Sequence, residues 1–105
     1  MDPSLLYEAM RAKQVDVLGA NSTDGRIVAY DLVVLEDDRH AIPPYDTVVL
    51  VSGRLAREHP DALAAVRELP GKIDADRMRR MNAEVDDKSQ SPAAVAEQFL
   101  GRISP

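Results

Sequence analysis

An uninterrupted apolar run, Leu32 to Leu35, is the feature that most constrains how this chain can fold. Asp31 precedes the run and Glu36 follows it, so its ends are charged while its middle carries no polar side chain. A β-strand that is covered on both faces has this composition, because neither face meets water. The run therefore predicts a short strand with packed layers above and below it.

Two other segments are also predicted to be strands. Val15 to Leu18 is a short run that stops at Gly19, ahead of a polar cluster. Thr47 to Val51 is the third strand, and it follows Pro43-Pro44, which cannot lie inside a central strand because proline has no N–H to donate.

The rest of the chain carries apolar residues at helical spacing, which predicts five helices. The first runs from about residue 3 to 13, with Asp2 as a cap and Pro3 at the first helical position. The order of helix, strands and helices predicts an α/β fold in which helices pack on a small sheet. Of the other four helices, one contains Leu55 and one spans Ala62 to Leu69 ahead of Pro70-Gly71. One follows a cap at Asp74, and the last runs from Ser91-Pro92 to about Ile103.

Size and charge narrow the classes of function. At 105 residues the chain predicts a single domain over positions 1–105. A net charge of −5 argues against nucleic acid and anionic membranes as partners, because phosphate binding needs clustered Lys and Arg. There is no cysteine, which excludes disulfides and thiolate metal sites. No apolar run approaches the roughly 20 residues of a transmembrane helix.

The acidic cluster after residue 35 invites a metal or hydrolase interpretation. Asp37, Asp38 and His40 lie close together, but they lack the alternating spacing of a calcium loop. His40 and His59 are not spaced as zinc ligands either. No nucleophile elbow and no glycine-rich phosphate loop is present in the sequence. We therefore expect a solvated turn here, and predict no catalytic residue, no metal, no cofactor and no enzyme activity.

Three short motifs lie between residues 21 and 45. They are Asn21-Ser-Thr-Asp-Gly25, a Leu-x-x-Leu-x-Asp-Asp pattern over 32–38, and Pro43-Pro44-Tyr45. Together they resemble the C-terminal part of the osmoprotectant-binding proteins of ABC importers for glycine betaine, choline and carnitine. The resemblance extends downstream and covers most of this chain, but only about the last third of a whole family member. Its downstream residues are Pro60, Leu63, Gly71-Lys72-Ile73, Met78, Asn82 and Phe99-Leu100.

The resemblance implies a partial lobe of a type II periplasmic-binding-protein fold, with about three short strands and five helices. It implies a solute-binding component of an ABC importer for quaternary-ammonium osmoprotectants, with a membrane permease as partner and a location outside the cytoplasm. The first residues, Met-Asp-Pro-Ser, have neither the basic nor the apolar region of a signal peptide. The resemblance therefore places the export signal upstream of residue 1.

Tyr45 is the first candidate ligand residue. A quaternary ammonium group has no N–H to donate, so proteins hold it with aromatic faces that contribute ~0.5–2 kcal/mol each. Tyr45 follows two prolines at a predicted strand entrance, where α/β folds place ligands. The resemblance assigns this tyrosine to an aromatic cage; the alternative is a half-buried tyrosine that covers a sheet edge.

Asn21, Thr23 and Asp24 are the other candidates. The family often carries a second cage aromatic at the position of Asn21, and an amide offers no π-face, which implies a different or less methylated solute or weak binding. Asn21 as a simple turn residue is the alternative. Thr23 and Asp24 could contact ligand, but capping a helical turn over Gly25–Tyr30 is favoured for both.

Residues outside these motifs are predicted to be structural. Asn82 lies in an apolar helix stripe, where an unpaired amide would cost ~1–3 kcal/mol, so we expect it to hydrogen-bond a neighbouring loop. Arg77, Arg79 and Arg80 are predicted to form a solvated basic face.

Unpaired strand edges lead to one more expectation. Three short strands without further neighbours expose edges and apolar surface, which recruit partners. We expect this chain alone to self-associate, for example by exchanging elements between copies. An alternative function is a stand-alone interaction or regulatory module derived from such a lobe that no longer binds solute, and the departure at Asn21 favours it.

Overall fold

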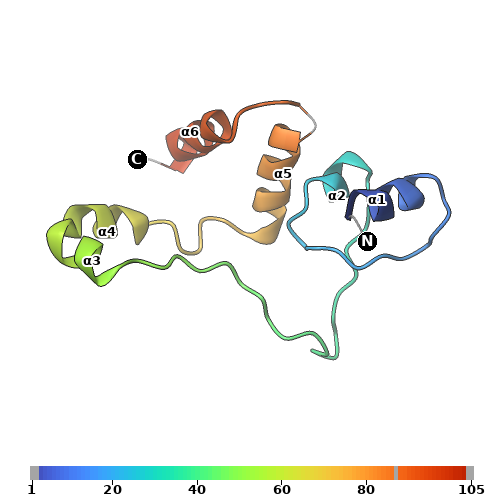
Figure 1. Cartoon of the computed structure of the whole chain (residues 1–105), viewed down its shortest axis with the longest axis horizontal. Coiled ribbons are helices and arrows are strands. Elements are labelled where there is room, and N and C mark those ends of the chain that lie inside the picture. Colours follow the sequence, from blue (N-terminus) through green and yellow to red (C-terminus); the bar gives the residue numbers. More distant parts are fainter. Residues whose placement is uncertain (1–2, 87, 104–105) are drawn as a thin grey trace. The chain divides into compact units, whose positions relative to one another are not determined.

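The structure is a computed structural model that describes residues 3–86 and 88–103. The chain divides into two compact units, one formed by residues 1–34 and 74–105 and the other by residues 35–73. In the described part of the chain the regular structure is helical (Figure 1). The helices are α1 (Pro3–Arg11), α2 (Arg26–Ala29), α3 (Gly53–Glu58), α4 (Pro60–Val66), α5 (Ala75–Asp86) and α6 (Pro92–Ile103).

Within the described residues, the buried ones lie in the first unit. It contains α1, α2, α5 and α6, with α2 packed on α5 and α5 packed on α6 (Figure 1). Each helix supplies one buried apolar side chain, and Tyr7 of α1 is the most enclosed of them at 2% exposed. Ile27, Ala83 and Val95 come from α2, α5 and α6 respectively. The core is therefore small and assembled from both ends of the chain.

Side-chain caps fix the start of the two long helices of this unit. The Asp74 carboxylate accepts a hydrogen bond from the backbone N–H of Arg77 at 2.7 Å. The Ser91 hydroxyl accepts one from the backbone N–H of Ala94 at 3.2 Å. Both bonds satisfy N–H groups that have no partner inside a helix. The predicted caps of these two helices are confirmed, whereas the predicted cap at Asp2 lies outside the described residues.

The second unit contains α3 packed on α4. The Ser52 hydroxyl caps α3 by accepting a hydrogen bond from the backbone N–H of Leu55 at 3.2 Å. Neither helix buries a residue fully. The chain leaves α4 through Gly71, whose φ of 78° is a left-handed conformation that glycine adopts without a Cβ penalty. The predicted helix at Leu55 is confirmed as α3. The helix predicted over Ala62 to Leu69 is present as α4, but it ends at Val66, so Leu69 lies beyond it.

The predicted α/β fold with about three short strands is wrong, because none of the described residues lies in a strand. The segments 15–18, 32–35 and 47–51 are irregular, and Val33 and Leu50 are 84% and 91% exposed. A strand exists only where a neighbouring strand accepts and donates its backbone hydrogen bonds. These segments carry strand-forming side chains, but β-propensity depends on packing against a neighbouring strand, and the described residues provide no such strand.

Candidate ligand-binding site

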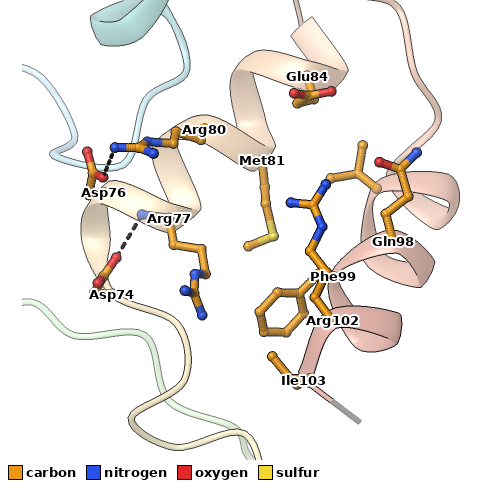
Figure 2. A pocket seen from close by; sticks show the side chains of 11 residues that line it. Asp74, Asp76, Arg77, Arg80, Met81, Glu84, Gln98, Phe99, Arg102 and Ile103 are labelled. Atoms are coloured by element: carbon orange, nitrogen blue, oxygen red, sulfur yellow. Dashed lines mark hydrogen bonds and ion pairs between the residues drawn. The ribbon is translucent and has the colours of Figure 1, made fainter.

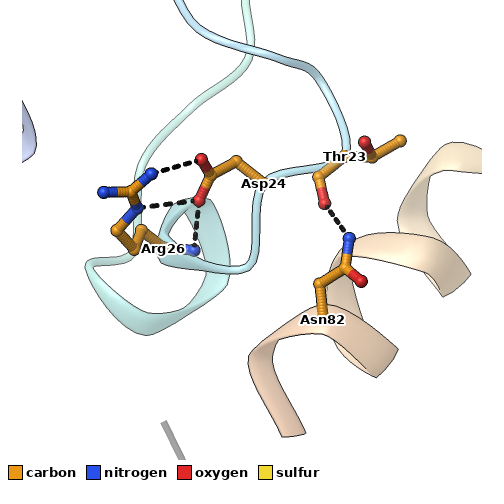
Figure 3. A network of polar contacts seen from close by, with 4 residues as sticks. All are labelled: Thr23, Asp24, Arg26 and Asn82. Atoms are coloured by element: carbon orange, nitrogen blue, oxygen red, sulfur yellow. Dashed lines mark hydrogen bonds and ion pairs between the residues drawn. The ribbon is translucent and has the colours of Figure 1, made fainter. Parts of the chain in front are cut away.

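A braced turn precedes α2. The Asp24 carboxylate accepts two hydrogen bonds from the Arg26 guanidinium, from Nε at 3.0 Å and from an Nη at 2.8 Å. The same carboxylate accepts a third from the backbone N–H of Arg26 at 3.0 Å (Figure 3). This bidentate pairing fixes the orientation of the Arg26 guanidinium as well as its distance from the Asp24 carboxylate. The Asp24 carboxylate thus satisfies the first backbone N–H of α2, in line with its favoured capping role, although the N-cap position itself is Gly25.

Arg26 also lies on the ring of Tyr7, with the guanidinium carbon 4.0 Å from the ring centroid. Tyr7 in turn meets Tyr30 edge to face, with ring centroids 6.3 Å apart. The Tyr30 hydroxyl donates to the Glu8 carboxylate at 3.3 Å. Cation–π and aromatic contacts of this type contribute ~0.5–2 kcal/mol each. Two of the three tyrosines therefore hold α1 against the turn and do not form a ligand cage.

The turn is also held against α5. The Asn82 side-chain amide donates to the Thr23 carbonyl oxygen at 2.8 Å (Figure 3). The Arg79 guanidinium donates to the Ser22 carbonyl oxygen at 2.8 Å, and its side chain is only 17% exposed. The prediction that Asn82 bonds a neighbouring loop is confirmed. The prediction of a solvated face is wrong for Arg79, because that side chain is used to hold the turn.

The pKa values of Asp24 in this turn and of Tyr7 in α1 are both shifted. The hydrogen bonds from Arg26 hold the pKa of Asp24 below its ordinary value, and this effect exceeds the opposing effect of burial. Burial raises the pKa of Tyr7, and the negative charge of Asp24 adds to the rise. Both shifts keep Asp24 ionised and Tyr7 neutral near pH 7, which suits a structural brace.

Asn21 is exposed at the start of the turn. Its carbonyl oxygen accepts a hydrogen bond from the backbone N–H of Asp24 at 3.1 Å, which closes the turn. Thr23 is half-buried beside it. The structure thus brings three of the four candidate residues into one turn, and it leaves the Asn21 side chain at the surface.

Tyr45 belongs to the second unit and is 98% exposed. It follows a tight turn in which both carboxylate oxygens of Asp37 accept backbone hydrogen bonds, from Ala41 at 3.0 Å and from Ile42 at 2.8 Å. The expected solvated turn after residue 35 is therefore present, and it is closed by Asp37. The alternative of a half-buried tyrosine on a sheet edge is wrong, because the ring is free and the described residues form no sheet.

A groove lies between α5 and α6 (Figure 2). Its apolar lining is Met81, Val95, Phe99 and Ile103, and the one aromatic ring among its lining residues, Phe99, already has the Arg77 guanidinium 5.9 Å from its centroid. A quaternary ammonium ion would have to compete with that cation. The groove is therefore a poor candidate for the solute site. Its charged lining is Asp74, Asp76, Glu84, Arg77, Arg80 and Arg102.

The described residues contain neither a membrane-spanning helix nor a cluster of metal ligands. No helix there is both long enough and apolar enough to span a bilayer. No three acidic or histidine side chains come together there in a way that could hold a metal ion.

Comparison with known proteins identifies the family. Residues 1–102 match the family described as the substrate-binding domain of the ABC-type glycine betaine transport system, so the chain belongs to this family. It is a family of transport proteins and not of enzymes. The resemblance inferred from the three motifs is thereby confirmed.

Curated relatives agree with this assignment. The carnitine transport binding protein OpuCC of Listeria monocytogenes is 39% identical over 100 residues, which are 95% of this chain and 32% of the relative. The glycine-betaine-binding protein of Pseudomonas aeruginosa is 33% identical over 100 residues, again 95% of this chain and 32% of the relative. The ergothioneine transport permease/ergothioneine binding protein EgtU of Helicobacter pylori is 31% identical over 103 residues, which are 98% of this chain and 19% of the relative.

A solved structure supports the same assignment. The crystal structure of a glycine betaine/carnitine/choline ABC transporter is similar to this chain with a TM-score of 0.86 and 43% identity. The match covers 94% of this chain and 36% of the solved one. The chain thus spans about a third of the length of the first two relatives and of this structure.

Proposed function

We propose that this chain forms one wall of the solute site in an ABC importer for quaternary-ammonium osmoprotectants such as glycine betaine or choline. In this proposal residues 1–105 act as a single domain equivalent to the C-terminal third of a two-lobed solute-binding protein. The partner is a membrane permease, and the site lies outside the cytoplasm. Family membership over residues 1–102 supports the solute-binding role and the permease as partner.

The exposure of Tyr45 is the observation that carries the proposal. The Tyr45 ring is 98% exposed, and exposure of its apolar surface to water is unfavourable unless a ligand covers it. The negative face of the ring attracts a methylated cation. The ring follows two prolines, which fix two backbone torsions and limit the motion that binding must arrest. Tyr45 is therefore proposed as a cage aromatic.

The turn at 21–24 is proposed as a second contact region. The Asn21 side chain is exposed, and its amide oxygen can accept a polarised C–H or order a water molecule beside the solute. The Asp24 carboxylate is already occupied by three hydrogen bonds from Arg26. Thr23 offers its hydroxyl as another polar group of the turn. We propose direct solute contact for Asn21 and Thr23, and an indirect contribution from Asp24 through the turn.

Isothermal titration calorimetry tests the proposal. Glycine betaine, choline and carnitine are titrated into this chain and into a version extended by the sequence that precedes it in its genome. Binding by the extended version supports the transport function. If neither version binds any of the three solutes, the transport function is wrong. The alternative, an interaction module that binds no solute and that Asn21 favours, then replaces it.

Variants of Tyr45 locate the site. Tyr45→Ala removes the aromatic face and is expected to weaken binding about 2- to 30-fold, the equivalent of one cation–π contact. Tyr45→Phe keeps the face and is the matched control, with an expected change below about 3-fold. Equal affinities for Tyr45→Ala and the parent would remove Tyr45 from the site.

Self-association of the chain by itself is part of the same proposal. Val33, Leu35 and Leu50 are 84%, 74% and 91% exposed, and extended apolar segments of this kind pair with other chains. Light scattering after size exclusion at micromolar concentration should give a mass above 11.5 kDa, the mass of one copy. A single species at the monomer mass contradicts this part of the proposal.

A further inference from the structure

We propose that Asp37 positions Tyr45 for solute binding, an inference that rests on the proposed role of Tyr45 as a ligand residue. Asp37 lies eight positions before Tyr45 in the sequence, within the same compact unit. It is a positioning residue in this proposal, because its own carboxylate is occupied by the backbone and does not meet the solute.

The geometry of the turn supports this role. Asp37 closes the turn at three points: Oδ1 accepts from the N–H of Ala41 at 3.0 Å, Oδ2 from that of Ile42 at 2.8 Å, and its carbonyl oxygen from that of His40 at 3.2 Å. His40 has a φ of 51°, a left-handed conformation that is uncommon for non-glycine residues, although histidine adopts it more often than most. The carboxylate of one residue thus organises the backbone up to Ile42.

The prolines extend this order to Tyr45. Ile42 is held by Asp37, and the next two residues are Pro43 and Pro44, whose φ angles are fixed by their rings. Each residue before a proline is also kept out of the helical region. Few torsions therefore remain free between the Tyr45 ring and the Asp37 clamp, by which we mean the two hydrogen bonds that the Asp37 carboxylate accepts from Ala41 and Ile42.

No other interaction replaces the clamp. Residues 43–51, all of which the structure describes, take part in no backbone hydrogen bond, and residues 41–50 are exposed throughout. The carboxylate is suited to the task because it is ionised: hydrogen bonds from Ile42 and Ala41 hold the pKa of Asp37 below its ordinary value. Preorganisation of this kind increases affinity by lowering the entropy lost on binding.

Asp38 provides a matched control. It is the neighbouring carboxylate, it is exposed, and its side chain makes none of the hydrogen bonds that Asp37 makes. Asp37→Ala and Asp38→Ala therefore change the net charge equally, but only the first opens the turn. Asp37→Asn keeps one carbonyl acceptor and should rescue part of the effect.

The first measurement is amide hydrogen exchange in the free chain by NMR. Asp37→Ala should speed exchange at Ala41 and Ile42 by about tenfold or more, Asp37→Asn by less, and Asp38→Ala by less than about twofold. Unchanged exchange in Asp37→Ala would show that the clamp does not form, and would overturn the inference.

The second measurement is glycine betaine and choline affinity by calorimetry, in the extended version of the chain. Asp37→Ala should weaken binding about 3- to 10-fold, and it should have no further effect when Tyr45 is already alanine. A residue that only supports the fold would weaken binding in both backgrounds, so additive effects overturn the inference. If Tyr45→Ala binds like the parent, or if no version binds, the proposed function fails as well. If Tyr45→Ala weakens binding and Asp37→Ala does not, only the Asp37 inference fails.

Discussion

Gly25 lies so close to α5 that a Cβ built at this position would be 2.6 Å from the backbone nitrogen of Ala83. The atoms in the way are backbone atoms of a helix, which cannot move aside as a flexible side chain can. Gly25 has a φ of −63°, an ordinary helical value, so the requirement for glycine here is steric. The closeness of the 21–25 turn to α5 thus depends on the absence of a side chain at this position.

Gly25→Ala is predicted to destabilise the chain. The added methyl group must push the turn away from α5, which costs about 1–3 kcal/mol of unfolding free energy, as overpacking usually does. Urea denaturation followed by circular dichroism measures the loss. Gly101→Ala is the control, because a Cβ at Gly101 in α6 meets nothing within 4 Å. Alanine is favoured over glycine inside a helix, so Gly101→Ala should raise the unfolding free energy by about 0.5–1 kcal/mol. The two Gly→Ala variants should therefore change the unfolding free energy in opposite directions.

Asn82→Ala is predicted to lower the unfolding free energy by about 1–3 kcal/mol, because the Thr23 carbonyl oxygen loses its 2.8 Å hydrogen bond. Thr23→Ala removes the side chain but keeps the carbonyl acceptor, so its effect should stay within about 0.5 kcal/mol. Chemical denaturation of both variants compares them. A larger loss for Thr23→Ala than for Asn82→Ala would contradict the assigned bond.

The Asp24–Arg26 pair predicts a pH dependence of stability. Arg26 holds the folded-state pKa of Asp24 below its ordinary value of 3.8, so the unfolded chain binds the proton more readily. The stabilisation is therefore complete above about pH 4–5 and is lost as the pH falls below 3.8 through the folded-state pKa. Unfolding free energy, measured by urea titration at a series of pH values, should rise with pH across this window.

Asp24→Asn isolates the contribution of this one carboxyl. Hydrogen bonds also depress the pKa of Asp37, so the parent chain combines at least two effects of the same sign. The pH dependence of the variant should be shallower than that of the parent between about pH 2 and 5. Parallel curves for the two proteins would show that the pair does not form.

Tyr7→Phe is predicted to leave the unfolding free energy unchanged or to raise it by up to about 1 kcal/mol. The Tyr7 hydroxyl is buried and lacks a hydrogen bond of good geometry among the described residues, and removing such a group relieves a desolvation cost. Tyr7→Ala should cost about 3–5 kcal/mol, because it removes the ring under Arg26 from the core. A clear destabilisation by Tyr7→Phe would show that the hydroxyl donates to Asp24 in solution.

Sequence patterns were sufficient for the helices. Asp74 and Ser91 are side-chain caps placed directly before apolar residues at helical spacing, and both accept the predicted kind of hydrogen bond. These signals are local, and local interactions decide where a helix starts. The prediction of three strands was wrong for the opposite reason. The apolar run at 32–35 has the composition of a strand, but a strand also needs a neighbouring strand, and no local sequence signal supplies that.

The candidate site was predictable in part. The capping role of Asp24 and the loop contact of Asn82 follow from residue type and position. Arg26 and Tyr7 were missed, because their contact joins residues far apart in the sequence and no spacing rule links them. The adjacency of Arg26 to the capping motif, two positions after Asp24, was the one available signal. Arg79 was missed in the same way, since a basic residue on a charged helix face is usually solvated.

The unit that contains Tyr45 is inserted between the two stretches that make the other unit. Residues 43–50 are exposed and irregular and take part in no backbone hydrogen bond, and exposed segments of this kind are preferred sites of proteolytic cleavage. A brief digestion should therefore cut the chain here first. Since α2 lies before the cut, α5 lies after it, and the two pack together, the halves should remain bound after cleavage. The chain would then behave as two polypeptides that hold one another without a covalent link.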